Sequence, residues 1–376
     1  MRLIFLLPLS ILLLSISVPA ALAAQTPPVP SAQPGPPMSG PFTPFVTSTS
    51  ATVMWISDST PIRYGPLGQE SEVHSFRMNR TQLNGLNPGS VIHYDIPGVG
   101  SGQFTTPPPP GAAANFNFVV FGDNRTRHDV YRQVAKEIAA LKPTFIVHTG
   151  DLVENGLNPA LWSIFFDISR DLLRNAAFFT TLGNHEGNSP YWYQFFDQHT
   201  GYYSFDWGKT HWAMLNTNNV PPDPEAYWAQ QLAWLEKDLE KNQGADFLFV
   251  AFHHTPYTAV KNRQAAAARI AARLVPIFKK YKVSAIFAGH DHNYQHHEEG
   301  GIPYIVTGGG GAPLYDVDGI MDITVKAEKV ENYVLCRTLA AAIRCEARAL
   351  GGRVIERFDL GPRKVTASAP VSPPLD

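Results

Sequence analysis

Five apolar runs in this 376-residue chain are each followed at once by a short group of Gly, Asp, Asn or His residues. The groups are Gly122-Asp123, Gly150-Asp151, Gly183-Asn184-His185-Glu186, His253-His254 and Gly289-His290-Asp291-His292. Short apolar runs that alternate with helical patterns predict the buried strands of an α/β sheet. Ligands of such sheets bind just beyond the carboxyl ends of the strands. We therefore expect the five groups to converge on one site.

The donor atoms in these groups predict a metal site. Carboxylate oxygen, amide oxygen and imidazole nitrogen together suit iron, manganese or zinc better than calcium or copper(I). A carboxylate placed between two ions bridges them, which allows a site of two metals about 3.5–4 Å apart. Each group alone is weak evidence, because a Gly-Asp pair after a strand is usually a turn. The succession of five groups favours the metal site.

Two kinds of pattern divide the chain. Residues 45–106 hold short alternating apolar runs separated by turn residues, which predict a small β-sandwich. The Pro-rich break at 107–110 ends that pattern. Beyond it we expect an α/β fold of sheets covered by helices. The expected strands are 115–121, 144–148, 177–182, 246–252 and 283–287, and the expected helices are 128–141, 160–174, 227–241 and 263–281.

The five groups together resemble the motifs of the calcineurin-like metallophosphoesterase superfamily. The early Val53-Met54-Trp55 run and the segment 81–94 resemble a fibronectin type III-like domain, which points to the purple acid phosphatase branch. The resemblance implies a four-layer sandwich, two β-sheets flanked by helices, preceded by a small all-β fibronectin type III-like sandwich. The implied domains are 45–109 for the sandwich and 110–362 for the metallophosphoesterase.

The resemblance also implies a role for each matched residue. The first metal would be held by Asp123 and His292, with Asp151 bridging both metals. The second would be held by Asn184, His290 and one histidine of the pair His253 and His254. His253 directly follows the expected strand, whereas His254 has the better spacing to Pro256, so both remain candidates. His185 would face the substrate as a catalytic proton donor.

Two positions depart from the family pattern near the first metal. Arg125 stands where many members have a histidine, and Glu154 stands where the purple branch has a tyrosine. Glu154 or solvent would then complete the first metal's ligands. A guanidinium fork matches phosphate oxygens, so Arg125 is a candidate substrate-binding residue. The alternative is that Arg125 is solvated or pairs with Glu154.

The termini and the charge balance bear on location and partners. Residues 1–24 have the basic start, apolar run and small-residue end of an export signal, residues 25–44 read as a Pro-rich linker, and residues 363–376 as a disordered tail. We expect a secreted or periplasmic protein with no stable membrane anchor after signal cleavage. The net charge of -2 offers no broad positive field for nucleic acid. In an oxidising compartment Cys336 and Cys345 would form a disulfide.

The expected function is hydrolysis of small phosphate monoesters, as in acid phosphatases, by attack of a metal-bound hydroxide. A phosphodiesterase is the close alternative, since one metal pair serves both reactions and fold does not fix the substrate. The alternative from another class is a non-catalytic exported binding protein with a weakened first-metal site.

Overall fold

The computed structural model describes residues 41–58, 62–64, 71–73 and 76–363. The predicted export signal at 1–24, the predicted linker as far as residue 40 and the predicted tail from 364 onward lie outside these ranges. No helix among the described residues is both long and apolar enough to cross a bilayer.

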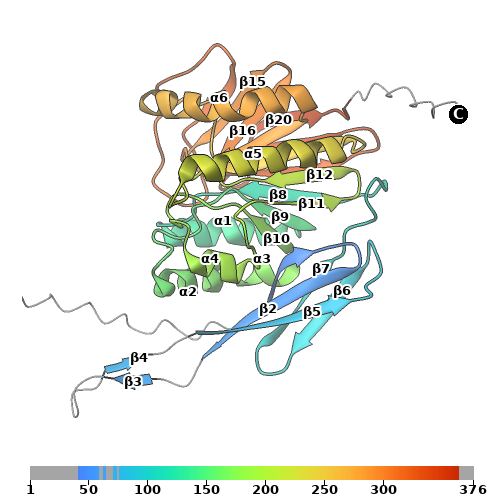
Figure 1. Ribbon diagram of the computed structural model, residues 1–376, viewed down its shortest axis with the longest axis vertical. Coiled ribbons are helices and arrows are strands. Elements are labelled where there is room, and N and C mark those ends of the chain that lie inside the picture. Colours follow the sequence, from blue (N-terminus) through green and yellow to red (C-terminus); the bar gives the residue numbers. More distant parts are fainter. Residues whose placement is uncertain (1–40, 59–61, 65–70, 74–75, 364–376) are drawn as a thin grey trace, which may run out of the picture. The chain divides into compact units, whose positions relative to one another are not determined.

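The first of two large sheets has six strands in the order β10-β9-β8-β18-β19-β20 (Figure 1). Its strands are β8 (Asn117–Phe121), β9 (Phe145–His148), β10 (Ala177–Thr180), β18 (Asn332–Thr338), β19 (Ile343–Ala349) and β20 (Val354–Leu360). The three earliest strands are parallel, and β18 returns antiparallel beside β8. The C-terminal strands therefore complete a sheet begun more than two hundred residues earlier.

The second large sheet has seven strands in the order β11-β12-β13-β14-β16-β15-β17. They are β11 (Tyr203–Trp207), β12 (Thr210–Met214), β13 (Phe247–His254), β14 (Ala285–Gly289), β15 (Tyr294–Glu299), β16 (Ile302–Thr307) and β17 (Thr324–Glu328). Strands β12, β13, β14 and β16 run parallel. Their carboxyl ends therefore share one edge.

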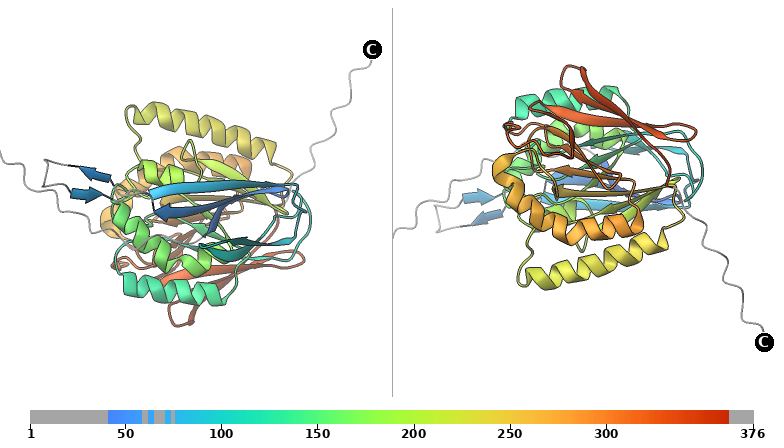
Figure 2. Two further views of the ribbon diagram at one scale, coloured as in Figure 1. Left: turned by 90° about the horizontal axis from the view of Figure 1, so that it is seen from below. Right: turned by 90° about the horizontal axis from the view of Figure 1, so that it is seen from above.

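Helices cover the outer face of each sheet (Figures 1 and 2). They are α1 (His128–Ala140), α2 (Pro159–Ile168), α3 (Arg170–Asn175), α4 (Pro190–Phe195), α5 (Pro224–Lys241) and α6 (Gln264–Tyr281), with a 3-10 turn at Lys261–Arg263. Three of them begin with a side-chain cap followed by proline: Asn158 caps α2, Ser189 caps α4 and Asp223 caps α5. A cap accepts an unpaired N–H and proline fits the first helical turn, which fixes these starts.

The alternation of side chains along the strands builds the layers. On β8, Val119 and Phe121 join the core that contains α1 to α4, whereas Phe118 and Val120 join the core that contains Trp212 of the other sheet. Successive strand residues point to opposite faces, so a strand with two apolar faces is buried on both. The sheets thus share one core, and each has a helix-lined core on its other face. The predicted α/β construction of sheets flanked by helices is confirmed.

The N-terminal region is all β, as predicted. A three-stranded sheet is formed by β1 (Phe42–Val46), β2 (Ser50–Asp58) and β5 (Phe76–Asn84), and two pairs are formed by β3 (Ile62–Tyr64) with β4 (Ser71–Val73) and by β6 (Val91–Ile96) with β7 (Gly100–Thr105). Phe42 and Met54 share a core with Trp162 of α2, and Val53 shares the core between the large sheets. The likeness to a fibronectin type III domain stays a prediction.

One expected helix is wrong in detail. The run 160–174 is divided into α2 and α3 at Ser169, a residue that is fully buried. Its hydroxyl lies 2.5 Å from the Tyr131 hydroxyl of α1, which holds the break against that helix. Periodicity over 160–174 does not reveal this tertiary hydrogen bond.

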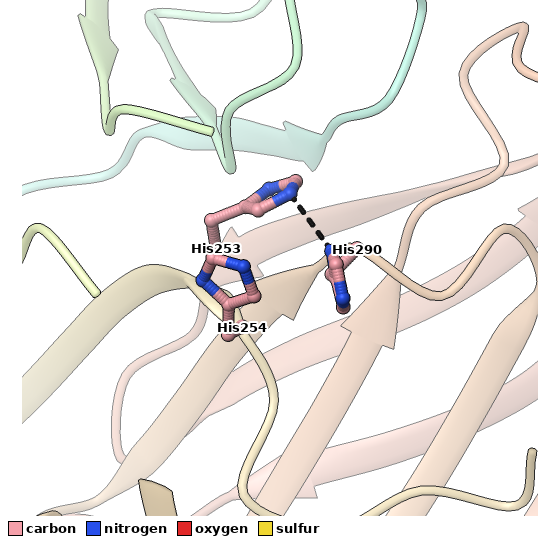
Figure 3. A group of neighbouring side chains, drawn as sticks. All are labelled: His253, His254 and His290. Carbon is pink, nitrogen blue, oxygen red and sulfur yellow. Dashed lines mark hydrogen bonds between the residues drawn. The ribbon is translucent and has the colours of Figure 1, made fainter. Parts of the chain in front are cut away.

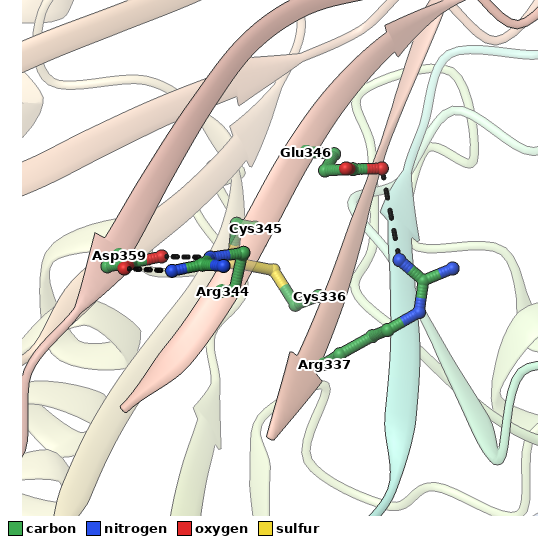
Figure 4. Close-up of a disulfide and its surroundings, with 6 residues drawn as sticks. All are labelled: Cys336, Arg337, Arg344, Cys345, Glu346 and Asp359. Atoms are coloured by element: carbon green, nitrogen blue, oxygen red, sulfur yellow. Dashed lines mark hydrogen bonds and ion pairs between the residues drawn. A yellow bond between two sulfur atoms is a disulfide. The ribbon is translucent and has the colours of Figure 1, made fainter. Parts of the chain in front are cut away.

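Cys336 and Cys345 form the predicted disulfide (Figure 4). They are direct partners across the antiparallel pair of β18 and β19, and both are fully buried. The bond therefore joins adjacent strands in the core between the sheets. Within the described residues no cysteine is left free.

Candidate metal centre

The five predicted groups lie at the carboxyl ends of strands from both large sheets. Asp123 follows β8, Asp151 follows β9, Asn184 and His185 follow β10, His253 and His254 end β13, and His290 and His292 follow β14. The structure brings the predicted metal ligands into two neighbouring groups, Asp123 with Asp151 and His292, and His253 with His254 and His290. Within each group the ligand atoms lie within 4.8 Å of one another.

The backbone is strained at three of these positions. Asp123, Asp151 and His290 have φ angles of 60°, 58° and 70°, in the left-handed region that non-glycine residues seldom adopt. Such conformations persist only where the surroundings hold them, and they concentrate at functional sites. The turns after β8, β9 and β14 thereby aim their side chains at the common edge. Gly289 has no room for a Cβ because the Asp123 carboxylate lies against it.

The first group is buried and rich in negative charge. Asp123, Asp151 and His292 are at most 2% exposed, and Nε2 of His292 lies 3.5 Å from Oδ1 of Asp123. Nδ1 of His292 donates to the carbonyl oxygen of Pro313 at 2.7 Å, which leaves Nε2 free to bind a metal. Burial lowers the pKa of His292 to about 4, so its ring is neutral.

The second group centres on Nε2 of His253 (Figure 3). Nδ1 of His253 donates to the Thr149 carbonyl oxygen at 2.9 Å, and burial lowers the pKa of His253 to about 3. The ring is therefore neutral and Nε2 carries a lone pair. This atom lies 3.0 Å from Oδ1 of Asn184, 3.4 Å from Oδ1 of Asp151 and 3.2 Å from Nδ1 of His290.

His254 belongs to the same group, but its ring contacts Thr217 and His290. Its Nδ1 lies 2.8 Å from the Thr217 hydroxyl, and its ring packs on His290 with centroids 4.3 Å apart. Burial lowers the pKa of His254 to about 3 and that of His290 well below its usual value. His254 also lines a cavity beside the group, which His253 does not.

The residues present fit metal ions. Oxygen atoms of Asn184 and Asp151 face the lone pair on Nε2 of His253 with no proton placed between them, as metal ligands do. In the first group, burial and the Asp151 charge raise the pKa of Asp123 well above its usual value. Two buried carboxylates this close need positive charge to stay ionised. Among the described side chains Arg125 alone pairs with one of them as a permanent cation.

Arg125 and Glu154 pair with each other, as in one of the two predicted alternatives. The Arg125 side chain is 11% exposed, and its Nε lies 3.3 Å from Oδ2 of Asp151 but forms no hydrogen bond. Glu154 is 44% exposed and points its carboxylate at Arg125 rather than at Asp123 or His292. Glu154 is thus engaged by Arg125, beside the first group.

His185 lies at the rim of the centre, with a quarter of its side chain exposed. Its Nδ1 donates to the Glu154 carbonyl oxygen at 2.8 Å, which leaves Nε2 as the proton-exchanging atom. Nε2 lies 3.9 Å from Oδ2 of Asp151, and the backbone N–H of His185 donates to Oδ1 of Asp151 at 3.0 Å. The ring is therefore held next to the centre and outside the ligand groups.

Glu186 positions the Asp151 turn and was given no role from the sequence. Its fully buried carboxylate accepts N–H bonds from Leu152 and Val153 on Oε1, and from Gly183 and Asp151 on Oε2, over 2.6–3.2 Å. Burial and the Asp151 charge raise the pKa of Glu186, against the lowering effect of those N–H groups. Four donors and no acceptor face the two oxygens, an arrangement that a carboxylate satisfies and a carboxylic acid does not.

Asp291 is a second residue without a predicted role. It is fully buried, accepts bonds from Thr258 and Gln295, and lies 3.3 Å from Nη1 of Arg263. Both Glu186 and Asp291 belong to the motifs that identified the ligands, and their acidic character inside apolar strand ends was the signal available in the sequence.

The segment that carries the proposed ligands is similar to a known protein family. Residues 116–294 match the model described as calcineurin-like phosphoesterase. Over this segment the chain is similar to the calcineurin-like metallophosphoesterase superfamily. A purple acid phosphatase of soybean (Glycine max) is 24% identical over 277 residues, which cover 66% of this chain and 59% of the relative. Residues 116–294, which match the family model, include every predicted metal ligand.

Solved structures agree on the fold. A purple acid phosphatase from yellow lupin (Lupinus luteus) seeds aligns with a TM-score of 0.69 at 16% identity, covering 86% of this chain and 74% of that one. A Plasmodium protein described as the anchor in the inner membrane complex aligns with a TM-score of 0.57 at 18% identity, covering 68% and 91%. At these identities the likeness shows the fold alone.

The chain spans between half and three fifths of the length of the first curated relatives that it matches, 59% of the soybean protein and 50% of a Mycobacterium tuberculosis protein.

Proposed function

We propose that this protein is a metallophosphoesterase that hydrolyses phosphate monoesters at a centre of two metal ions. The observation that carries the proposal is the position of Asp151. One of its oxygens lies 3.4 Å from Nε2 of His253 in the second group, while the residue itself belongs to the first group with Asp123 and His292. A carboxylate shared by two ligand groups is what a pair of metals requires.

The ligands divide accordingly. Asp123 and His292 would hold the first ion and Asp151 would contact both. Asn184, His290 and His253 would hold the second. His253 is preferred to His254 because its Nε2 faces Asn184 and Asp151, whereas His254 packs on His290 and lines the neighbouring cavity. The mixture of carboxylate, amide and imidazole donors suits iron, manganese or zinc.

Two metal ions would lower the pKa of water and neutralise phosphoryl charge in an in-line displacement. The protein groups around them have separate tasks. His185 keeps Nδ1 on a backbone carbonyl, so Nε2 can give a proton to the leaving oxygen. Arg125 has a buried Nε without a hydrogen bond, which can donate to a phosphoryl oxygen once Asp151 is engaged by metal.

Export is part of the proposal. The apolar run within residues 1–24 supports it, and so does the buried disulfide of Cys336 and Cys345, because disulfides persist in oxidising compartments. The protein would then act outside the cytoplasm on small phosphate esters. Its oligomeric state is left open.

One observation favours a non-catalytic binding protein as the second candidate. Arg125 pairs with Asp151 next to the proposed position of the first ion. A cationic side chain so close to that position weakens metal binding. The aligned Plasmodium protein is described as an anchor. Fold alone does not decide between these functions.

Hydrolysis of p-nitrophenyl phosphate and of bis(p-nitrophenyl) phosphate, by protein loaded separately with iron, manganese or zinc, tests the proposal. Faster cleavage of the monoester supports it, and faster cleavage of the diester shows a phosphodiesterase. An Asp151→Asn variant controls for contaminating phosphatases, because it retains shape but loses the bridging charge. Absence of turnover by folded, metal-loaded protein on either ester contradicts a general phosphatase.

A further inference from the structure

A cavity of about 430 Å³ opens directly beside the second ligand group. Asn184, His254 and His290 line one side of it, and the first half of α6 lines the other. A phosphoryl group at the metal centre therefore has one end of this cavity next to it. The leaving group of an ester bound there has this space to enter.

Arginines dominate the charge of the cavity. Arg263, Arg269 and Arg273 line it, and Asp291 is the one carboxylate among its lining residues. Asp291 lies 3.3 Å from Nη1 of Arg263, and Glu225 accepts a bond from Arg273 at 2.7 Å. Within the described part of the chain no carboxylate lies within ion-pair distance of Arg269. Arg269 donates instead to the backbone oxygen of Ala265 in its own helix, at 3.3 Å.

Aromatic rings hold the two flanking arginines in place. The guanidinium carbon of Arg263 lies 4.5 Å from the centroid of the Tyr315 ring, and Tyr315 stacks on His292 of the first ligand group. The guanidinium carbon of Arg273 lies 5.0 Å from the Trp228 ring, which is buried in the wall of the cavity. Stacked guanidinium groups lose little freedom when they bind an anion, because their orientation is already set.

Small and apolar residues complete the lining on α6. Ala266, Ala267 and Ile270 lie between the arginines along the helix. These three side chains offer no hydrogen bonds, and the uncharged polar side chains of the lining, such as Asn218 and Asn219, lie outside α6. The polar contacts on this side are cationic, and a guanidinium pairs with carboxylate or phosphate oxygens through parallel N–H bonds.

We propose that the cavity binds the leaving group of the substrate and that Arg269, together with Arg263 of the same lining, binds a second anionic group on that leaving group, a carboxylate or a second phosphate. The inference rests on the proposed function, since it takes the ester phosphate to lie at the metal centre. The reaction consumes water: the bond from phosphorus to the ester oxygen breaks, that oxygen takes a proton, and inorganic phosphate and an anionic alcohol leave.

Binding of phosphonates, which hydrolysis cannot consume, tests the inference on the full metal-loaded chain. Isothermal titration calorimetry compares 3-phosphonopropionate with propylphosphonate, which has the same phosphonate without the carboxylate. We expect 3-phosphonopropionate to bind at least tenfold more tightly, about 1.4 kcal/mol. A third ligand, propane-1,3-bisphosphonate, separates the two sources: tighter binding than 3-phosphonopropionate identifies a second phosphate, and weaker binding a carboxylate.

Two variants of α6 locate the effect. Arg269→Gln should reduce the tenfold ratio to about two. Lys280→Gln removes the same charge from the same helix outside the cavity, where Lys280 pairs with Glu236, and should keep the ratio. Equal affinities for the two wild-type ligands, a ratio that survives in Arg269→Gln, or no binding of either ligand would overturn the inference.

Measurement of turnover distinguishes a failure of this inference from a failure of the proposed phosphatase function. A preserved ratio in protein that does not cleave p-nitrophenyl phosphate supports the anion pocket and contradicts the phosphatase. Cleavage with a ratio of one supports the phosphatase and contradicts the anion pocket.

Discussion

Replacement of Glu186 by glutamine should damage the metal centre although Glu186 is not itself a proposed ligand. The carboxylate of Glu186 is fully buried and accepts four backbone N–H bonds, two on each oxygen. Those bonds fix the turn that carries Asp151 in its left-handed conformation. Glutamine keeps the shape of the side chain but replaces one acceptor oxygen by an NH₂ group. In either orientation two backbone donors then face another donor.

The magnitude follows from that count. A hydrogen bond to a charged group contributes about 1.5–3 kcal/mol, and a buried donor left without an acceptor costs a similar amount. Loss of two such bonds should lower the free energy of unfolding by about 3–6 kcal/mol, in the tail of single-residue effects. Loss of a group that orients a metal ligand typically lowers metal affinity by about 10–100-fold.

Urea unfolding of metal-free protein measures the first effect, and competition with a chromophoric chelator measures the second. Glu356→Gln is the matched control, because Glu356 accepts bonds from Tyr294 at 2.9 Å and His296 at 3.0 Å on strand β15 of the other large sheet, and contacts no proposed ligand. It should lower stability and leave metal affinity unchanged. Loss of less than 1 kcal/mol in Glu186→Gln, with wild-type metal affinity, would refute the assigned role.

Three further outcomes are expected. Burial lowers the pKa of His211, but hydrogen bonds to the two aspartates beside it outweigh burial and raise the pKa to about 9. This value exceeds the pKa of about 6.5 in the unfolded chain. About 3 kcal/mol of stability is therefore present below pH 6.5 and is lost as the pH rises through 9. Urea unfolding at pH 6 and pH 9.5 should show that loss in wild type and not in His211→Gln. Joint replacement of Cys336 and Cys345 by alanine should lower the free energy of unfolding by about 2–4 kcal/mol. The comparison requires that wild type and variant show the same dependence of the free energy of unfolding on urea concentration. Arg125→His removes a cation beside Asp151 and adds an imidazole. The more weakly bound of the two metal ions should then bind about tenfold more tightly, as measured by chelator competition. Equal or weaker binding would contradict the account of the first site.

The ligand groups could be predicted because they depend on local order. A strand end with Gly and then a polar residue fixes where the side chain lies once strands are parallel, and β8, β9 and β14 obey that rule. Asp123, Asp151, His290 and His292 therefore lie where the motifs indicate. The predicted strand and helix ranges differ mostly at their ends, where caps such as Asp223 decide.

Other features depend on contacts that no local pattern records. The choice between His253 and His254 was open because strand pairing shifts register between Phe252 and His254, so alternation does not tell which ring faces the centre. The pairing of Arg125 with Glu154 joins residues 29 apart in the chain. Arg269 is a candidate anion-binding residue because α6 lines the cavity beside Asn184, which the sequence pattern does not reveal.

Anomalous diffraction from crystals loaded with manganese or zinc tests the central claim most directly. We expect two peaks about 3.5–4 Å apart, one contacted by Asp123 and His292, the other by Asn184, His253 and His290, with Asp151 contacting both. A single peak within one ligand group, or metal bound only away from these residues, would contradict a two-metal centre.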